Sequence, residues 1–462
     1  MKKLPNMIII HSDQHRFDCI KANGHEFIQT PALDRLAGEG VNFTCAFTPS
    51  PICSPARASL MNGAWPVQHG CMSIPGTEIF RPAKKEFTLW SNLLAENGYQ
   101  LGYVGKYHQE FEGTPLDYGF SSYHPLSEYN TWRSEKKFEP LPRENGWFGE
   151  KDPFVSPRET RLAWGAGKII ELLKNYHNSK MPFLLRWDPV EPHLPNIIPD
   201  PYFSMYAPGS IRPWPNFSDE LRGKPYIQAQ QKRTWEVDGW TWEKWAPLVS
   251  RYLGEISLLD HEIGRVLDCL DETGMADNTC IIYTTDHGDM CGAHGMIDKH
   301  FIMYDDVMHV PLIMRFPGKV KTGSKCRSFV INEIDIAATV CDIGNVRKPE
   351  TFTGKNLVES ANNTEPEERQ DVFGMWHGGQ FSSYSQRMVR DRKWKYIWNM
   401  CAEDELYDLA ADPAEIINHA ADPGYRQELH RLRMRMISWM ESVNDVMLNP
   451  WTRKQLAQDL KA

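Results

Sequence analysis

The chain has 462 residues, of which 41% are hydrophobic and 24% are charged, and this composition is typical of a folded globular protein. Its formal net charge of −9, without any dense run of Lys or Arg, argues against a nucleic acid or an anionic lipid surface as the main partner. No stretch approaches the roughly 18 consecutive apolar residues that span a membrane, and the length predicts one large and one small domain.

The first apolar run, at residues 7–10, is too short for the core of a signal peptide, and no small-residue cleavage site follows it. We therefore expect a cytoplasmic protein, unless a leader has been removed. The 10 cysteines have no paired spacing, which fits reduced thiols better than a disulfide framework. The sequence leaves the oligomeric state open.

The first predicted unit is a buried strand at residues 7–11, which ends in the polar run Ser12-Asp13-Gln14. A helix is expected over residues 30–40, because Pro31 suits a first helical position and Gly40 suits a helix end. Strand and helix thus follow each other from the start of the chain.

Three later strands also end in polar residues. The strand at 100–104 leads to Gly105-Lys106-Tyr107-His108, the strand at 183–187 to Glu191-Pro192-His193, and the strand at 280–285 to Asp286-His287-Gly288-Asp289. With helical patterns at 87–97 and 251–271, this alternation predicts an α/β fold with a large, mostly parallel sheet sandwiched by helices. Ligands bind at the carboxyl ends of such strands, so these polar runs are candidates for chemistry.

Two changes of composition suggest how the chain is divided. Residues 1–350 are expected to form the catalytic domain, in which the Trp- and Pro-rich stretch 121–246 has poor periodicity and suggests an insertion over the edge of the sheet. Alternating patterns within 388–398 and a helical pattern at about 425–443 predict a smaller C-terminal α+β domain at 351–462, with an antiparallel sheet and a helix.

The sharpest local motif is Cys53-Ser54-Pro55-Ala56-Arg57, followed by a helical pattern that ends at Gly63. Ser54 suits a helix cap and Pro55 the first position, which would place Cys53 just before the amino end of a helix, where anions are attracted. Arg57 would lie one turn inside. A cysteine on its own is more often a small buried hydrophobic residue than a nucleophile, so the motif and not the thiol carries the functional interpretation.

Cys-x-Pro-x-Arg resembles the signature of type I sulfatases, and the resemblance extends over nearly the whole chain in order and spacing. It implies an alkaline phosphatase-like fold. It also implies that a formylglycine-generating maturation enzyme oxidises Cys53 to formylglycine, the nucleophile of that family.

Asp13-Gln14 and Asp286-His287 match the two pairs that hold the metal in that family, with residue 53 as a further ligand. Each pair by itself would be ordinary turn chemistry. Many sulfatases have Asp and Asn where this chain has Gln14 and His287. Oxygen donors favour Ca²⁺ as the single divalent ion, whereas the imidazole keeps Mn²⁺ open and Mg²⁺ also remains possible on this donor set.

Four more residues match family positions that surround the sulfate: Lys106, His108, His193 and Lys299. Taken singly, a lysine is usually a solvated charge and a loop histidine is usually structural. The resemblance implies that His193 is the general acid, beside Lys299 on the leaving-group side, and that His108 orients or deprotonates the nucleophile. Arg57, Lys106 and the metal would offset charge on the sulfuryl oxygens.

These features predict a sulfuric ester hydrolase that acts on a small sulfated substrate, with a sulfated carbohydrate favoured. One alternative is a phosphonate monoester or phosphodiester hydrolase of the same superfamily, some of which share the Gln and His metal ligands. A second is a non-catalytic carbohydrate-binding protein, in which Cys53 stays a thiol and aromatic residues such as Trp235, Trp240, Trp242 and Trp245 stack on sugars.

Overall fold

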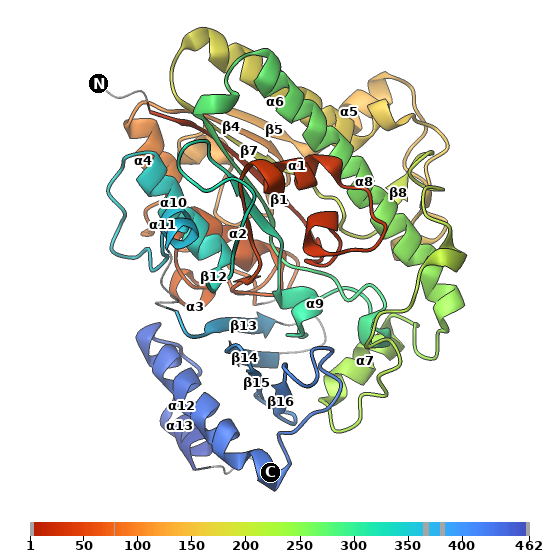
Figure 1. The fold of residues 1–462 in the computed structure, drawn as a ribbon, viewed down its shortest axis with the longest axis vertical. Coiled ribbons are helices and arrows are strands. Elements are labelled where there is room, and N and C mark those ends of the chain that lie inside the picture. Colours follow the sequence, from red (N-terminus) through yellow and green to blue (C-terminus); the bar gives the residue numbers. More distant parts are fainter. Residues whose placement is uncertain (1–3, 78, 364–368, 379–383, 459–462) are drawn as a thin grey trace.

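A computed structural model describes residues 4–77, 79–363, 369–378 and 384–458 of the chain. Its centre is an eight-stranded sheet in the order β11-β2-β10-β9-β1-β7-β4-β5 (Figure 1). The strands are β1 (Asn6–Ser12), β2 (Val41–Phe43), β4 (Gln100–Gly105), β5 (Ser122–Pro125), β7 (Phe183–Asp188), β9 (Thr279–Thr285), β10 (Leu312–Arg315) and β11 (Ser324–Cys326). Among these described strands only β10 runs antiparallel to its neighbours, which confirms a mostly parallel sheet.

Helices cover both faces of this sheet. Ile8 and Ile10 of β1 face a core shared with α1 (Pro31–Glu39), α6 (Arg161–Ser179) and α8 (Trp242–Glu272). Met7 and Ile9 face the opposite core, which is shared with α2 (Cys53–Asn62), α4 (Trp90–Glu96) and α10 (Asn332–Ile343). A strand that alternates between two apolar cores must be hydrophobic throughout, as β1 is. None of the helices in the described ranges is both long and apolar enough to cross a membrane.

The predicted insertion at 121–246 is not a single insertion. Both β5 and β7 belong to the main sheet, and α6 packs against β4 and β7. The remaining segments carry α5 (Leu126–Glu135), the short pair β6 (Glu150–Lys151) and β8 (Ile197–Ile198), and α7 (Tyr226–Thr234). The poor periodicity of this stretch therefore reflects long connections between core elements.

The tryptophans of this stretch contribute to a hydrophobic core. Trp245 is fully buried beside Val237 and Leu248, and Trp235, Trp240 and Trp242 pack on the same cluster. Helix α8 starts at Trp242, well before the predicted start at 251, although it contains Pro247. Its first turns pack Trp242 and Trp245 into this cluster, and such packing stabilises the early start. The tryptophans thus give little support to a sugar-stacking surface.

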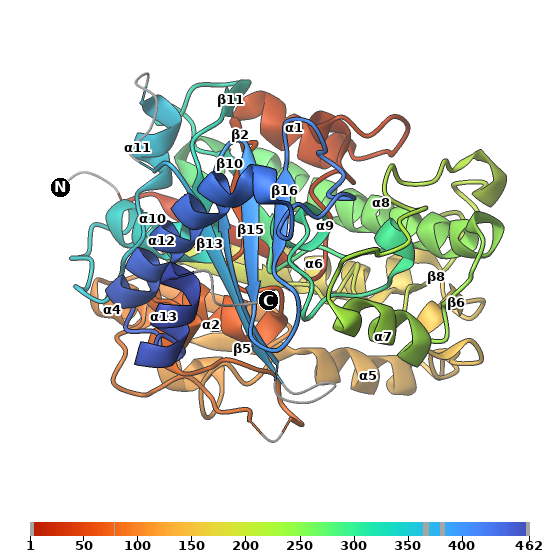
Figure 2. The ribbon, with the colours of Figure 1, turned by 90° about the horizontal axis from the view of Figure 1, so that it is seen from below.

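The C-terminal part contains the predicted antiparallel sheet and helix, and a second helix follows. It comprises β13 (Val372–Gly378), β14 (Tyr384–Arg390), β15 (Trp394–Asn399) and β16 (Glu405–Asp408), with α12 (Arg426–Ser442) and α13 (Pro450–Ala457). Figure 2 shows α12 and α13 lying together along one side of this sheet. The short elements β3 (Ala46–Phe47), β12 (Val330–Ile331), α3 (Pro66–His69), α9 (Asp305–Met308) and α11 (Leu357–Asn362) belong to the larger part.

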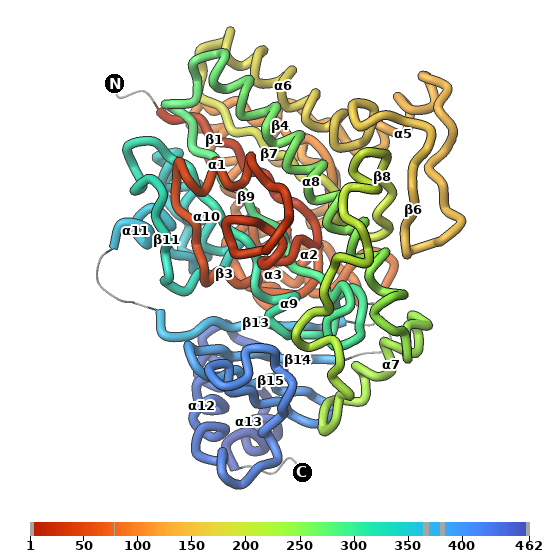
Figure 3. Tube along the Cα trace, turned by 45° about the vertical axis from the view of Figure 1, so that its right-hand side comes forward, coloured from red at the N-terminus to blue at the C-terminus, as the bar shows by residue number. Residues whose placement is uncertain are grey.

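The two parts of the chain share one apolar core. Figures 1 and 3 both place β13 directly beside α9, and Lys395 of β15 donates a hydrogen bond of 2.6 Å to Asp305 of α9. Buried Trp65 and Met303 from the larger part lie in the same cluster as Trp398 and Met436 from the smaller part. The boundary at residue 350 stays a prediction.

Candidate active site

Four neighbouring parallel strands deliver polar residues to one edge of the sheet. In the order β9-β1-β7-β4, Asp286 follows β9, Asp13 follows β1, Asp188 ends β7 and Lys106 follows β4. Since the carboxyl ends of parallel strands meet at the same edge, residues from distant parts of the sequence become neighbours.

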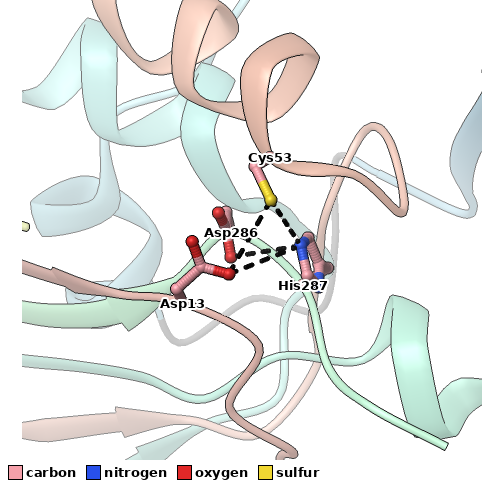
Figure 4. A group of neighbouring side chains, drawn as sticks. All are labelled: Asp13, Cys53, Asp286 and His287. Atoms are coloured by element: carbon pink, nitrogen blue, oxygen red, sulfur yellow. Dashed lines mark hydrogen bonds and ion pairs between the residues drawn. The ribbon is translucent and has the colours of Figure 1, made fainter. Parts of the chain in front are cut away.

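The Cys53 cluster consists of Asp13, Cys53, Asp286 and His287, whose potential ligand atoms all lie within 4.8 Å of one another (Figure 4). Sγ of Cys53 lies 3.3 Å from Nε2 of His287 and 3.7 Å from Oδ1 of Asp13. Nε2 of His287 also lies 3.5 Å from Oδ1 of Asp286. All four side chains are buried.

Cys53 is itself the first residue of α2, so the helix begins two residues earlier than the predicted start at Pro55. Ser54 does not cap it: its hydroxyl donates to the backbone oxygen of His108 at 2.8 Å. Every residue of α2 is buried, and the helix packs against α10 and α3. Tertiary packing rather than a side-chain cap therefore fixes where this helix starts.

Arg57 links three carboxylates at the strand ends. Its guanidinium donates to Asp286 at 2.9 Å, to Asp188 at 2.5 Å and to Asp13 at 3.1 Å, and it also donates to the backbone oxygen of Ser12 at 3.3 Å. Four of its five N–H donors are thus used within the protein, and the side chain has no exposed surface. In this arrangement Arg57 holds Asp13 and Asp286 in place. Its expected role in offsetting charge on the sulfuryl oxygens stays a prediction.

Lys106 and Lys299 bring positive charge to the cluster. Lys106 forms an ion pair with Asp13, and Nζ of Lys299 donates to Oε1 of Gln14 at 2.5 Å. Burial opposes ionisation of the Cys53 thiol, but both lysines and His287 outweigh that effect and hold the pKa of the thiol well below its usual range. The site therefore favours a negative charge at residue 53.

Within the described residues, neither His193 nor His108 makes a side-chain hydrogen bond to the Cys53 cluster. Nδ1 of His193 is 2.6 Å from the backbone oxygen of Leu194, and burial together with Lys299 lowers the pKa of His193 to about 4. A cavity of about 90 Å³ beside His193 is lined by Arg161 and Glu191 as well. Nδ1 of His108 is buried and has no hydrogen-bond partner among the described residues.

Three carboxylates at the site were not singled out from the sequence. Asp188 binds Arg57 and Arg186, and burial is outweighed by these cations, so its pKa is held below its usual range. Asp289 and Asp298 accept hydrogen bonds from Nε2 of Gln14. Asp188 ends a strand and Asp289 is the last residue of the polar run after another strand, and both positions are sequence signals. Asp298 had no such signal.

The cluster fits a divalent cation. Nδ1 of His287 is 2.9 Å from the backbone oxygen of Gly288, so a proton on Nδ1 leaves the Nε2 lone pair facing Asp13 and Asp286. Two carboxylates and an imidazole then face a common centre. This donor set suits an ion that accepts both oxygen and nitrogen ligands.

Comparisons with known proteins agree with this geometry. The sequence profile described as Sulfatase matches residues 5–346, and the profile described as N-sulphoglucosamine sulphohydrolase, C-terminal, matches residues 292–442. The chain is 29% identical to an arylsulfatase of Clostridium perfringens, covering 95% of this chain and 94% of that protein. It is 26% identical to an N-acetylglucosamine-6-O-sulfatase of Bacteroides thetaiotaomicron, covering 90% and 82%.

A solved structure has a similar fold throughout. The phosphonate monoester hydrolase of Agrobacterium radiobacter superposes with a TM-score of 0.81 at 25% identity, covering 95% of this chain and 96% of that chain. The fold is therefore shared by relatives whose names indicate more than one substrate class.

Proposed function

This chain belongs to the sulfatase family of the alkaline phosphatase-like superfamily, and we propose that it uses residue 53, as formylglycine, to release sulfate from a sulfated carbohydrate. The observation that carries the proposal is the Cys53 cluster: residue 53 lies with Asp13, Asp286 and His287 within 4.8 Å, beside Lys106 and Lys299. Conversion of the cysteine by a maturation enzyme is part of the proposal.

Formylglycine at residue 53 would supply a nucleophilic oxygen from its aldehyde hydrate, and a divalent cation would lower the pKa of that hydroxyl and offset charge on the sulfate. Asp13, Gln14, Asp286 and His287 would hold the cation, for which we favour Ca²⁺ over Mn²⁺ or Mg²⁺ because most donors are oxygens. Arg57 keeps two of these carboxylates in place through its own hydrogen bonds.

Two lysines and a histidine beside the cluster have separate proposed roles. We assign Lys106 to offsetting charge on the sulfuryl oxygens, and Lys299 and His193 to the leaving-group side, where His193 protonates the leaving oxygen. Since the pKa of His193 is about 4 in the free protein, its imidazole is uncharged at neutral pH. An anionic ester bound beside it favours the imidazolium, so substrate binding prepares the acid. We assign His108 to orienting or deprotonating the nucleophile, since its buried Nδ1 has no hydrogen-bond partner among the described residues.

A screen of regiospecifically sulfated mono- and disaccharides tests the substrate class. The enzyme is first checked by intact-protein mass spectrometry for conversion of the Cys53 thiol to an aldehyde and is then reconstituted with Ca²⁺, Mn²⁺ or Mg²⁺. We expect sulfate release from at least one sugar with at least one ion. Fully converted, metal-loaded protein that releases no sulfate from sugars or from 4-nitrophenyl sulfate would contradict the proposal. A chain that carries only the thiol after co-expression with a maturation enzyme would favour a binding protein.

A second candidate is hydrolysis of phosphonate monoesters or phosphodiesters. Its support is the 25% identity and full-length overlap with the Agrobacterium hydrolase, together with Gln14 and His287 at the metal positions. Against it stands the cationic residue Lys106, which contacts Asp13. Comparing kcat/KM for the 4-nitrophenyl esters of sulfate, phenylphosphonate and a phosphodiester distinguishes the two, and we expect the sulfate to be the best substrate.

A further inference from the structure

Gln14 has every polar group of its buried side chain paired. Its Nε2 donates to Oδ2 of Asp289 at 2.5 Å and to Oδ1 of Asp298 at 3.1 Å. Its Oε1 accepts from Nζ of Lys299 at 2.5 Å. An amide nitrogen has two hydrogens, so the two carboxylates use its whole donor capacity.

These charges determine which way the amide points. The reversed amide would place a carbonyl oxygen against two carboxylates and an NH₂ group against an ammonium, which leaves buried polar atoms without partners. Oε1 must therefore lie on the side of Lys299, whose charge interacts with both Cys53 and Asp13. One lone pair of Oε1 accepts from Lys299 and the second is available for another partner.

The two carboxylates that orient Gln14 are themselves held in place. Oδ1 of Asp289 accepts from the backbone N–H groups of Cys291 at 2.7 Å and of Asp298 at 3.1 Å. Oδ2 of Asp298 lies 2.9 Å from Nε2 of His300. Both carboxylates that accept from the Gln14 amide thus have further polar contacts of their own.

The backbone of Gln14 is held as well. Its N–H donates to Oδ1 of Asp286 at 3.2 Å, and its carbonyl oxygen accepts from the hydroxyl of Tyr252 at 2.7 Å. The residue has a positive φ of 67°, which turns the chain directly after β1. Because these contacts fix the backbone of Gln14, its remaining freedom is rotation of the side chain. The hydrogen bonds to Asp289 and Asp298 restrict that rotation.

We propose that Asp289 and Asp298 are positioning residues that present Oε1 of Gln14, a neutral oxygen donor, to the divalent cation of the Cys53 cluster. The inference rests on the metal centre of the proposed function. It explains why a glutamine serves at this position: a carboxylate there would face two further buried carboxylates. It also limits the negative charge of the ligand set to Asp13 and Asp286, which suits an anionic ester.

A double-mutant cycle on metal affinity tests this inference without relying on turnover. Dissociation constants for Ca²⁺ and Mn²⁺ are measured by isothermal titration calorimetry on the full chain and on Gln14→Ala, Asp298→Ala and the double variant. We expect Asp298→Ala to weaken binding about 10- to 100-fold when Gln14 is present and to have no further effect when residue 14 is alanine. Asp298→Asn keeps an acceptor oxygen and should stay close to wild type.

A charge exchange provides a second test if Asp298→Ala does not fold. Gln14→Glu adds a negatively charged ligand. If the side chain at position 14 moved freely, this variant would bind the metal more tightly than wild type. Our inference predicts weaker binding, because Asp289 and Asp298 repel the new carboxylate, and it predicts recovery in Gln14→Glu with Asp298→Asn, whose amide can donate to it. Tighter binding by Gln14→Glu would overturn the inference.

Asp219→Ala is the matched control. Asp219 is also a buried aspartate, but it binds His294 at 2.6 Å and Lys224 at 2.5 Å and has no contact with Gln14. We expect a lower melting temperature with an unchanged metal dissociation constant. If the losses of metal affinity caused by Gln14→Ala and Asp298→Ala add up in the double variant, the positioning role is overturned but the metal centre is not. A wild-type chain that binds no divalent ion would overturn the metal centre of the proposed function.

Discussion

At the scale of single residues, residue 53 combines burial with concentrated positive charge. Lys106, Lys299 and His287 favour a negative charge at this position, although the side chain is almost fully buried and Asp13 lies 3.7 Å away. The two lysines that lower the pKa of the thiol are placed to stabilise an oxygen nucleophile or an anionic ester. The surroundings of residue 53 therefore favour a negative charge, whether the side chain ends in the sulfur of cysteine or in an oxygen of formylglycine.

Cys53→Ser tests the part played by the aldehyde hydrate. A serine hydroxyl can accept the sulfuryl group from an ester but has no second hydroxyl whose deprotonation expels sulfate. We expect one round of ester cleavage and loss of steady-state turnover, with a peptide sulfated on the serine at position 53 in the mass spectrum. Cys53→Ala should give neither product, and unchanged turnover of Cys53→Ser would rule out the mechanism.

His193→Ala tests the general acid through the leaving group. Loss of a general acid typically lowers rates about 10²- to 10⁴-fold, but an ester with a good leaving group needs little protonation. We expect kcat/KM to fall by about 10²-fold or more for sugar sulfates and much less for 4-nitrophenyl sulfate. Equal losses on both substrates would show that His193 does not act on the leaving oxygen.

At the scale of elements, a buried carboxylate connects two helices that cover one face of the sheet. Asp260 of α8 accepts hydrogen bonds from the backbone N–H groups of Ala32 at 3.0 Å and Leu33 at 2.8 Å, in the first turn of α1. It caps that helix from outside, although Thr30 makes no side-chain capping bond there. Burial raises the pKa of Asp260 to about 7.

Asp260→Asn should change how stability depends on pH. The pKa of the Asp260 carboxyl is about 7 in the folded protein, above its ordinary value of 3.8. The contribution of this group to the free energy of unfolding is therefore greatest at low pH and is lost as the pH rises through 7. We expect wild type to lose about 2 kcal/mol more stability than the variant between pH 5.5 and pH 8. Melting temperatures of both proteins across this range measure the difference, and parallel curves would contradict the assignment.

At the scale of the whole molecule, the C-terminal sheet is bound to the larger part by core packing and by charge. Arg390 and Lys395 both donate to Asp305, and Arg390 also lies 4.6 Å from the centre of the Phe47 ring. The large apolar cluster contains residues from both sides of position 350. An interface of this kind resembles the interior of one domain more than a contact between two.

A chain that ends at residue 350 should therefore fail to fold on its own. Truncation exposes Trp65, Met303 and Met308 from the shared cluster to water. We expect the full chain to unfold in one calorimetric transition and the truncated chain to lack a near-ultraviolet circular dichroism signal. Two separate transitions in the full chain, or a soluble and cooperatively folded fragment, would support independent domains.

Much of the fold could be predicted from local patterns. The strand at 7–11 is apolar throughout because it packs against a core on each face, and the polar runs after β1, β4 and β9 mark their carboxyl ends. The structure of residues 121–246 was harder to predict, since the tryptophans there are buried by contacts with distant residues such as Ile297. The start of α8 was placed too late for the same reason.

Periodicity and short motifs were enough to predict the α/β class, the family resemblance and the residue types at the strand ends, because each of these depends on local sequence. The pairing of those residues is visible only in the folded chain: Arg57 binds the carboxylates at the strand ends, and the amide of Gln14 is oriented by Asp289, 275 positions away. Hydrogen-bond partners and burial depend on which distant segments the sheet brings together, and no local pattern records that.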